Sequence, residues 1–333
     1  MARLAVALIL GLAAGAPARA GASVGTAELR ADIAVLADDA MEGRGTGTPG
    51  GARAEAWVQA AFAGMGLQPG AARGGWRQIV PVRALVGRVP RPGRPLPGPL
   101  HPANIVGRVS GRDPRAGAVM LMAHLDHLGF CRAAGDADRI CNGANDNASG
   151  TAVLLAVARR IASGPRPARS VYFVATTGEE MGRLGSHWLA EHPPLPLRRI
   201  VAVLNLDMVA GAGRDAPLAV LGRGRFPALD AAIDASARRL GRRMDPGTHA
   251  NILEQRQDGW SFASRDVPAA MVNGSLGDMT ATKAFFASRY HKPDDDLAHL
   301  PPLDGVAQDA DLHVALVHTL ADPATYPAAP NRN

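Results

Sequence analysis

The chain has 333 residues, 47% of them hydrophobic, which is enough to bury the core of one large domain or two small ones. Its net charge is +6, and its basic residues are scattered arginines, with Lys283 and Lys292 as the only lysines. Scattered arginines without dense basic blocks or interleaved aromatic residues argue against a nucleic-acid-binding surface.

The first twenty residues are typical of a secretory signal peptide. A short basic start at residues 1–3 precedes an apolar run at 4–14, and Ala18-Arg19-Ala20 fits a small-residue cleavage pattern. The run is too short for a typical membrane span, and no later run reaches that length. The sequence therefore predicts an exported protein, periplasmic or secreted, cleaved near Ala20 and without stable membrane insertion.

Residues 26–66 carry two predicted helices, at 26–41 and 51–65, separated by a glycine-rich loop. A strand is predicted at 76–82. Residues 89–102 are rich in proline and indicate a connector without regular structure, too short to hold an inserted domain. A core at 104–321 follows, and it begins with a strand at 105–109.

Within this core, strand patterns alternate with helix patterns. Apolar runs predict strands at 118–123, 170–176, 200–206, 218–221 and 268–272, and helices at 151–161, 185–191, 227–240 and 304–321. This alternation favours an α/β fold, in which helices cover both faces of a mixed, mostly parallel sheet.

The strand predicted at 118–123 ends in His124 and Asp126. Open α/β sheets bind ligands at the carboxyl ends of their strands, so this end is a candidate site. Both side chains lie on the same side of an extended chain, which predicts that Asp126 orients the His124 imidazole. Taken alone, the two residues could equally be polar groups of a surface loop.

Cys131 and Cys141 are the only cysteines, and both follow this strand. Two cysteines so close together in an exported protein predict a disulfide. The alternatives are two free thiols, or Cys131 as a metal ligand.

More imidazole and carboxylate groups follow other predicted strands or lie in later loops: Asp146, Glu179, Glu180, Asp207 and His291. If these groups meet at one sheet edge, the crowded carboxylates raise one another's pKa values unless cations neutralise them. Two divalent ions would do so. Imidazole and carboxylate ligands without thiolate suit zinc in a catalytic site.

The motifs that carry these residues resemble those of the M28 family of zinc peptidases, the di-zinc aminopeptidases. The matching stretches are His124-Leu-Asp-His-Leu-Gly129, Asn142-Gly-Ala-Asn-Asp-Asn-Ala-Ser-Gly150, Thr177-Gly-Glu-Glu-Met-Gly-Arg-Leu-Gly-Ser186, Asn205-Leu-Asp-Met-Val209 and Tyr290-His-Lys-Pro-Asp-Asp295. Weaker matches are Glu42-Gly-Arg44 and residues 104–107. The resemblance spans residues 27–320, and it implies one exopeptidase domain at 21–333 that acts on peptides as an aminopeptidase.

Carried over to these positions, the resemblance implies two zinc ions per chain, bridged by Asp146. His124 and Asp207 would complete one metal site. Glu180 and His291 would complete the other. The resemblance also suggests a strained peptide bond after Asp146, for which the cis form is one option.

Glu179 would be the general base that activates the attacking water. The family's usual Ser-Asp-His reads Gln257-Asp258-Gly259 here, which removes a histidine near the substrate and leaves specificity open. No role is predicted for His127, His187, His249 or His299.

Two other interpretations stay open. A single-zinc glutaminyl cyclase on the same fold would not need both His124 and Asp207 as ligands. A catalytically inactive binding module would be expected to have lost ligands, and all of them are present in this sequence.

Overall fold

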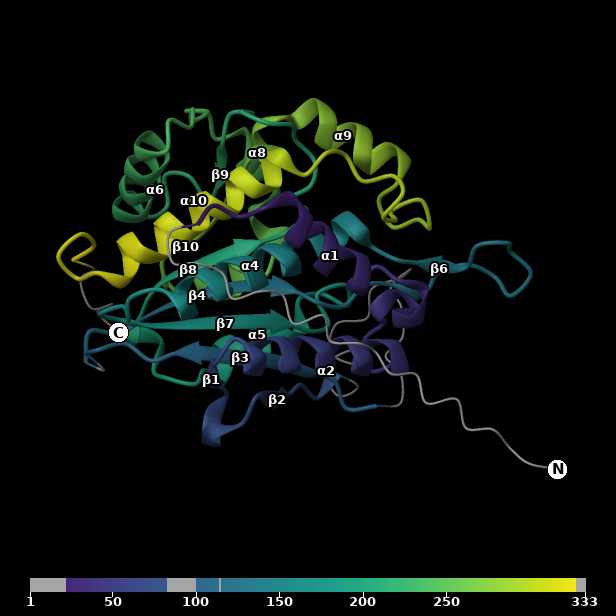
Figure 1. The fold of residues 1–333 in the computed structure, drawn as a ribbon, viewed down its shortest axis with the longest axis horizontal. Helices are drawn as coiled ribbons and strands as arrows, with labels where there is room; N and C mark the ends of the chain where they lie inside the picture. Colours follow the sequence, from purple (N-terminus) through teal and green to yellow (C-terminus); the bar gives the residue numbers. More distant parts are fainter. Residues whose placement is uncertain (1–21, 83–99, 114, 328–333) are drawn as a thin grey trace.

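The computed structural model describes residues 22–82, 100–113 and 115–327 (Figure 1). The predicted signal peptide at 1–20 and most of the proline-rich connector at 89–102 lie outside these ranges and stay predictions. No helix within the described ranges is long and apolar enough to cross a membrane.

A mixed sheet of eight strands forms the centre of the structure. The strands are β1 Gln68–Pro69, β2 Arg77–Ile79, β3 Ala103–Val109, β4 Ala118–His124, β7 Ser170–Thr176, β8 Ile200–Leu206, β9 Ala219–Leu221 and β10 Ala269–Asn273. Their order is β1-β3-β7-β4-β8-β10-β9, with β2 also paired to β3. The neighbours β7, β4, β8 and β10 run parallel, so their carboxyl ends meet at one edge.

Helices cover both faces of the sheet, which confirms the predicted fold class. One face packs against α1 Thr26–Leu36, α2 Pro49–Gly64, α4 Gly150–Ser163 and α10 Asp304–Ala321. The other face packs against α5 Leu184–Glu191 and α7 Trp260–Ala263. Strand β4 shows why both faces need cover: Leu121 points to the first layer and Met122 to the second, and every residue of β4 is buried.

The remaining helices are α6 Pro227–Arg239, α8 Gly274–Gly277 and α9 Met279–Ser288. Helix α6 packs on α10, and α8 packs beside β9. The sequence analysis did not predict α8 or α9, nor the 3₁₀ segment His249–Arg256. The 3₁₀ segment and α8 are short and pack on β9, which is distant from the 3₁₀ segment and α8 in sequence, and α9 packs on α8.

The first helix is shorter than predicted, because α1 ends at Leu36 and residues 39–44 form 3₁₀ turns. Gly43 has a φ of +60° in these turns, and an added Cβ there would lie 2.4 Å from the carbonyl oxygen of Cys141. This tight turn sends the side chain of Arg44 into the protein, where it is completely buried.

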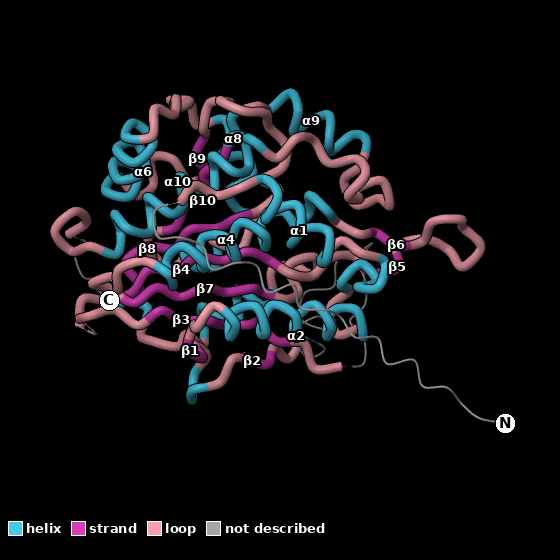
Figure 2. The backbone as a smooth tube through the Cα atoms, in the orientation of Figure 1, coloured by secondary structure: helices cyan, strands magenta, loops and turns pink. Residues whose placement is uncertain are grey.

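A hairpin that the sequence analysis did not predict follows β4. It pairs β5 Gly129–Phe130 with β6 Ile140–Cys141, and its loop projects from the edge of the molecule (Figure 2). Cys131 and Cys141 form the predicted disulfide at its base.

Candidate metal centre

The candidate site lies at the carboxyl ends of the parallel strands. His124 is the last residue of β4, Glu179 and Glu180 follow β7, and Asp207 follows β8. Asp146 comes from a wide helical turn at Ala144–Ser149, just before α4. The sheet topology thus brings together groups far apart in sequence, as expected for an open α/β sheet.

The first cluster joins His124, Asp146 and Asp207, all buried. The Nε2 atom of His124 lies 3.3 Å from Asp146 Oδ1 and 3.3 Å from Asp207 Oδ1. Zinc bonds of about 2.0 Å in a tetrahedral site place neighbouring ligand atoms about 3.3 Å apart. These three groups therefore have the spacing of zinc ligands.

A second cluster uses the other oxygen of Asp146. Its Oδ2 atom lies 3.3 Å from His291 Nε2, which in turn lies 3.1 Å from Glu180 Oε2. His291 reaches the cluster from the loop after α9, and its ring stacks on Tyr290 with centroids 3.7 Å apart. Asp146 thus belongs to both clusters, one oxygen in each.

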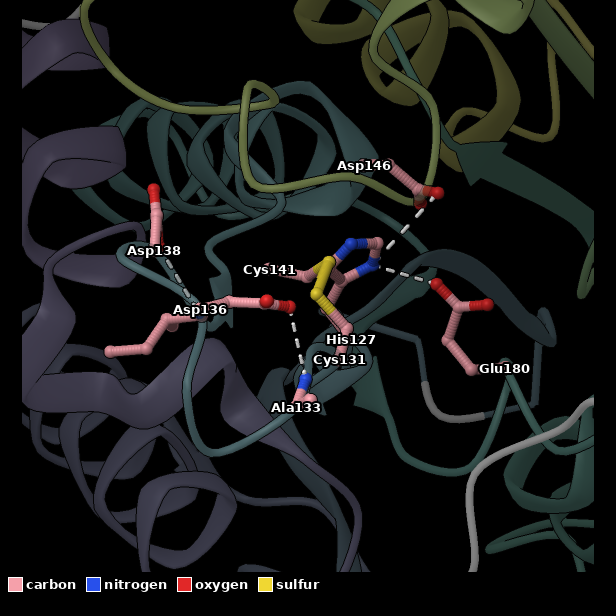
Figure 3. The surroundings of a disulfide bond; sticks show 9 residues. His127, Cys131, Ala133, Asp136, Asp138, Cys141, Asp146 and Glu180 are labelled. Carbon is pink, nitrogen blue, oxygen red and sulfur yellow. Dashed lines mark hydrogen bonds and ion pairs between the residues drawn. A yellow bond between two sulfur atoms is a disulfide. The ribbon is translucent and has the colours of Figure 1, made fainter.

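His127 also reaches the second cluster, although the sequence analysis gave it no role. Its Nδ1 atom lies 2.7 Å from Glu180 Oε1 and 3.9 Å from Asp146 Oδ2 (Figure 3). The side chain is completely buried. A signal was present in the sequence, because His127 is the third ionisable residue within four positions at the end of β4.

Asp126 supports the site differently from the prediction. The Nδ1 atom of His124 pairs at 3.1 Å with the backbone carbonyl of Asp126, and not with its carboxylate. The carboxylate instead accepts hydrogen bonds from Thr46 Oγ1 at 2.9 Å and from the backbone amide of Glu179 at 3.1 Å. Asp126 therefore holds the ends of β4 and β7 in a fixed relation, because Glu179 follows β7.

The turn that carries Asp146 is held from outside. The carboxylate of Asp295 accepts hydrogen bonds from the backbone amides of Asn145 and Asp146, at 2.8 and 3.0 Å. The peptide bond between Asp146 and Asn147 is cis, as the resemblance suggested. Asp295 belongs to the same motif as His291, so this motif contributes a second group to the site.

Burial and mutual interaction shift the acidities of these groups. Burial raises the pKa of Glu179 well above its ordinary value of 4.5, and the nearby carboxylates of Glu180 and Asp258 add to the shift. Burial and the Asp146 charge oppose ionisation of Glu180, but hydrogen bonds from the cluster's imidazoles outweigh both and lower its pKa to about 2. Glu179 and Glu180 are adjacent in sequence, yet their environments push their proton affinities in opposite directions.

His291 is shifted in a third way. Its burial alone would lower the pKa, but the nearby carboxylates of Asp146 and Glu180 raise the pKa of His291 to about 10. An imidazole between two carboxylates is therefore protonated at neutral pH until a metal ion takes the place of the proton.

A cavity of about 380 Å³ opens beside the two clusters. His124, Asp146, Glu179 and Asp207 lie in its wall. Most of the remaining wall is apolar and consists of Met208, Leu221, Leu253, Met271, Leu276 and Phe286. Gln257, where the resemblance leads one to expect serine, also lines the cavity. A concave apolar pocket with a few converging polar groups is the usual form of a small-ligand site.

A mixed α/β sheet with two acidic, imidazole-containing clusters at its strand ends has the architecture of a zinc exopeptidase. Residues 104–314 match Peptidase family M28, which is well over half of the chain. The protein belongs to this family of zinc metallopeptidases.

Curated relatives match over limited stretches. A probable zinc metalloprotease of Leptosphaeria maculans is 28% identical over 149 residues, 44% of this chain and 34% of that protein. Aminopeptidase YwaD of Bacillus subtilis is 44% identical over 92 residues, 27% of this chain and 18% of that protein. The matched segments thus span about a third or less of these relatives.

Solved structures share the fold over most of the chain. The zinc aminopeptidase BSAP of Bacillus subtilis has a TM-score of 0.64 at 16% identity, over 92% of this chain and 98% of that one. The glutaminyl cyclase of Porphyromonas gingivalis also has a TM-score of 0.64, at 18% identity, over 88% of this chain and 98% of that one. The fold is therefore common to peptide hydrolysis and to glutamine cyclisation, and the site must decide between them.

Proposed function

We propose that this protein is a di-zinc aminopeptidase that removes N-terminal residues from peptides. The observation that carries the proposal is the sharing of Asp146 between two clusters, with Glu179 beside them in the wall of one cavity. A single-zinc enzyme would have no use for the first cluster and the second together.

The residues present fit two zinc ions. His124 and Asp207 would hold one ion, Glu180 and His291 the other, and Asp146 would contribute one oxygen to each. Among the described residues, the buried Nε2 atom of His291 has no aligned hydrogen bond, although two carboxylates lie within 3.3 Å of it. Atoms that face one another without hydrogen-bond alignment are expected where they all point toward one ion.

The protein's own groups account for the proton movements. Zinc bound at these clusters would supply an activated water and polarise the scissile carbonyl. Glu179 belongs to neither cluster found among the described residues, and it lies in the cavity wall. As a carboxylate beside the clusters and without a place among their ligands, it can accept a proton from the attacking water and pass that proton to the leaving amine.

The cavity supports an apolar side chain on the N-terminal residue of the substrate. Its walls beyond the clusters are mainly methionine, leucine and phenylalanine. An apolar side chain buried there gains transfer free energy of about 1.5–3 kcal/mol. Arg256 also lines the cavity, so we expect leucine, methionine and phenylalanine substrates to be preferred over basic ones.

The test uses purified protein that has been loaded with zinc and desalted. Elemental analysis should give close to two zinc ions per chain, and leucine 4-nitroanilide should be hydrolysed. The N-acetylated anilide should not react, because an aminopeptidase requires a free amine. Equal cleavage of both anilides would overturn the aminopeptidase assignment, and cyclisation of N-terminal glutamine without hydrolysis would favour the cyclase.

We also propose that the protein acts outside the cytoplasm, in the periplasm or after secretion. The signal-peptide pattern at residues 1–20 supports this. The disulfide between Cys131 and Cys141 supports it independently, because such bonds persist in oxidising compartments. N-terminal sequencing of protein recovered from the periplasm or medium should begin near Gly21, and recovery of full-length protein from the cytoplasm alone would contradict the proposal.

A further inference from the structure

His127 makes the shortest imidazole–carboxylate contact reported at either cluster. Its Nδ1 atom lies 2.7 Å from Glu180 Oε1, whereas the corresponding distances of His124 and His291 are 3.1–3.3 Å. The ring of His127 is completely buried and meets the ring of His291 edge to face, with centroids 5.6 Å apart.

This difference in distance separates a donor from a ligand. Two atoms 2.7 Å apart cannot both bind one zinc at about 2.0 Å unless the angle at the metal closes to about 85°, well below the tetrahedral value of about 109°. A separation of 2.7 Å is that of a charge-assisted hydrogen bond. The 3.9 Å distance from His127 to Asp146 Oδ2 is too long for a ligand pair of the same kind.

We propose that His127 is a positioning residue, which donates its Nδ1 proton to Glu180 Oε1 and thereby aims Glu180 Oε2 at the second metal position. The inference rests on the proposed di-zinc function. Glu180 Oε2 is the oxygen that faces His291, at 3.1 Å. Without the donor, Glu180 loses the hydrogen bond that fixes its Oε1 atom, while the like charge of Asp146 still opposes its placement beside that residue.

The surroundings hold the His127 ring in this orientation. An added Cβ at Gly143 would lie 2.6 Å from the ring, so the backbone of the turn that leads to Asp146 packs directly on the imidazole. Gly143 also has a φ of +58°, a conformation that glycine adopts without strain. The ring therefore connects Glu180 to this turn.

The first cluster has a different support. His124 pairs with a backbone carbonyl, that of Asp126, and no side chain of the described residues donates to Asp207 except His124 itself. Loss of His127 should therefore weaken one metal position and leave the other nearly unchanged. Removal of such an outer hydrogen-bond partner typically costs about 10- to 100-fold in metal affinity.

Three substitutions at position 127 separate the roles. His127→Asn places an amide nitrogen near the position of Nδ1 and can keep the hydrogen bond. His127→Gln places its amide near the position of Nε2, where it cannot donate to Glu180 Oε1. His127→Leu removes the donor altogether. His318→Leu is the matched control, because His318 is exposed on α10, whose last residue pairs with Arg169 at the start of β7, the end of that strand opposite the site.

Metal-free wild type and variants are titrated with zinc against a chelator of known affinity, which measures binding without any activity assay. We expect two tight sites in wild type, His127→Asn and His318→Leu. We expect one tight site and one about 10- to 100-fold weaker in His127→Leu and His127→Gln. If His127→Leu does not fold, the comparison of Asn with Gln decides the question.

Equal zinc affinities in the Asn and Gln variants, or wild-type affinity in His127→Leu, would overturn the inference while leaving the di-zinc proposal intact. Fewer than two sites in wild type would instead overturn the di-zinc proposal. X-ray absorption of the two-zinc wild type gives the number of imidazoles per zinc. We expect one on average, and a value near 1.5 would show that His127 is itself a ligand.

Discussion

The carboxylate of Asp126 accepts a 3.1 Å hydrogen bond from the backbone amide of Glu179. One residue follows β4 and the other follows β7, so the bond joins the ends of two neighbouring parallel strands. Asp126 is almost fully buried, and burial raises its pKa to about 6. Among the described residues, no hydrogen bond joins the Asp126 carboxylate to His124. Asp126 therefore matters for the site because it positions Glu179.

Asp126→Asn should therefore lower turnover more than metal content. The amide keeps the size of the side chain, but its nitrogen cannot accept the bonds that Thr46 and the Glu179 amide donate. We expect kcat to fall about 10- to 100-fold, with both zinc ions retained. Asp136→Asn, in the exposed loop of the hairpin, is the control and should match wild type. Unchanged kcat in Asp126→Asn would show that Glu179 needs no such support.

Arg44 holds the backbone beneath the clusters. Its guanidinium donates hydrogen bonds of 2.6–2.9 Å to four carbonyls, those of Leu36, Leu125, Asn142 and Gly143. Leu125 lies next to His124, and Gly143 lies at the start of the turn that carries Asp146. Burial lowers the pKa of Arg44 to about 10, which still leaves it charged at neutral pH.

Arg44→Met should be strongly destabilising. Four buried carbonyls lose their donor, and each such loss costs about 1 kcal/mol or more, so we expect the free energy of unfolding to fall by roughly 3–5 kcal/mol. Arg53→Met removes an exposed ion pair with Glu42 and should cost less than about 1 kcal/mol. Urea unfolding of both variants measures the difference, and equal losses would contradict this role for Arg44.

The sequence predicted the fold well where the pattern is local. The apolar run of β4 and the helix patterns of α4 and α10 are visible in single stretches of sequence, so the α/β class followed from them. The shorter pieces did not follow. The β5–β6 hairpin packs on the 3₁₀ turns at residues 39–44, and α8 packs on β9, so both depend on segments distant in sequence, and no periodicity marks them.

The candidate site divides in the same way. Motif spacing pointed to His124, Asp146 and Glu180, because strand ends and their turns carry recognisable residue types. Motif spacing could not show that His127 donates to Glu180. Whether a histidine near the site makes such a hydrogen bond depends on a distance that the sequence does not contain. Motif spacing also could not show that the carboxylate of Asp126 points toward Glu179. Alternation along a strand predicts on which side of the strand a side chain lies, but not which residue it contacts.

Zinc binding should release protons. In the metal-free protein, the carboxylates of Asp146 and Glu180 outweigh burial and raise the pKa of His291 to about 10. This imidazole is then protonated at pH 7 and must lose its proton to bind metal, so zinc binding should release at least about one proton per chain.

The sign of the pH dependence follows from the same shift. Apparent zinc affinity should rise with pH above 7 and level off for the His291 position near pH 10, where the imidazole is already neutral. Zinc added to metal-free protein in weak buffer, with a pH indicator, measures the release. A protein-free titration corrects for hydrolysis of zinc itself. Release of no protons at pH 7 would contradict the assignment of His291 as a ligand.

The adjacent glutamates give the sharpest test of mechanism, because the proposal assigns them different roles. Glu179→Gln keeps the shape of the side chain but cannot accept a proton. It should retain both zinc ions and lose kcat by about 10²–10⁴-fold, the usual contribution of a general base. Glu180→Gln should instead lose zinc from the second position, because a neutral amide is a poorer ligand than a carboxylate.

The two variants thus separate on two measurements, turnover and zinc content, made on the same samples. Each is the other's control, since both replace a carboxylate by an amide in the same turn. Loss of zinc in Glu179→Gln with both ions retained in Glu180→Gln would mean that the roles are exchanged. Wild-type turnover in Glu179→Gln would show that proton transfer does not pass through this residue, and the proposed hydrolytic mechanism would then be wrong.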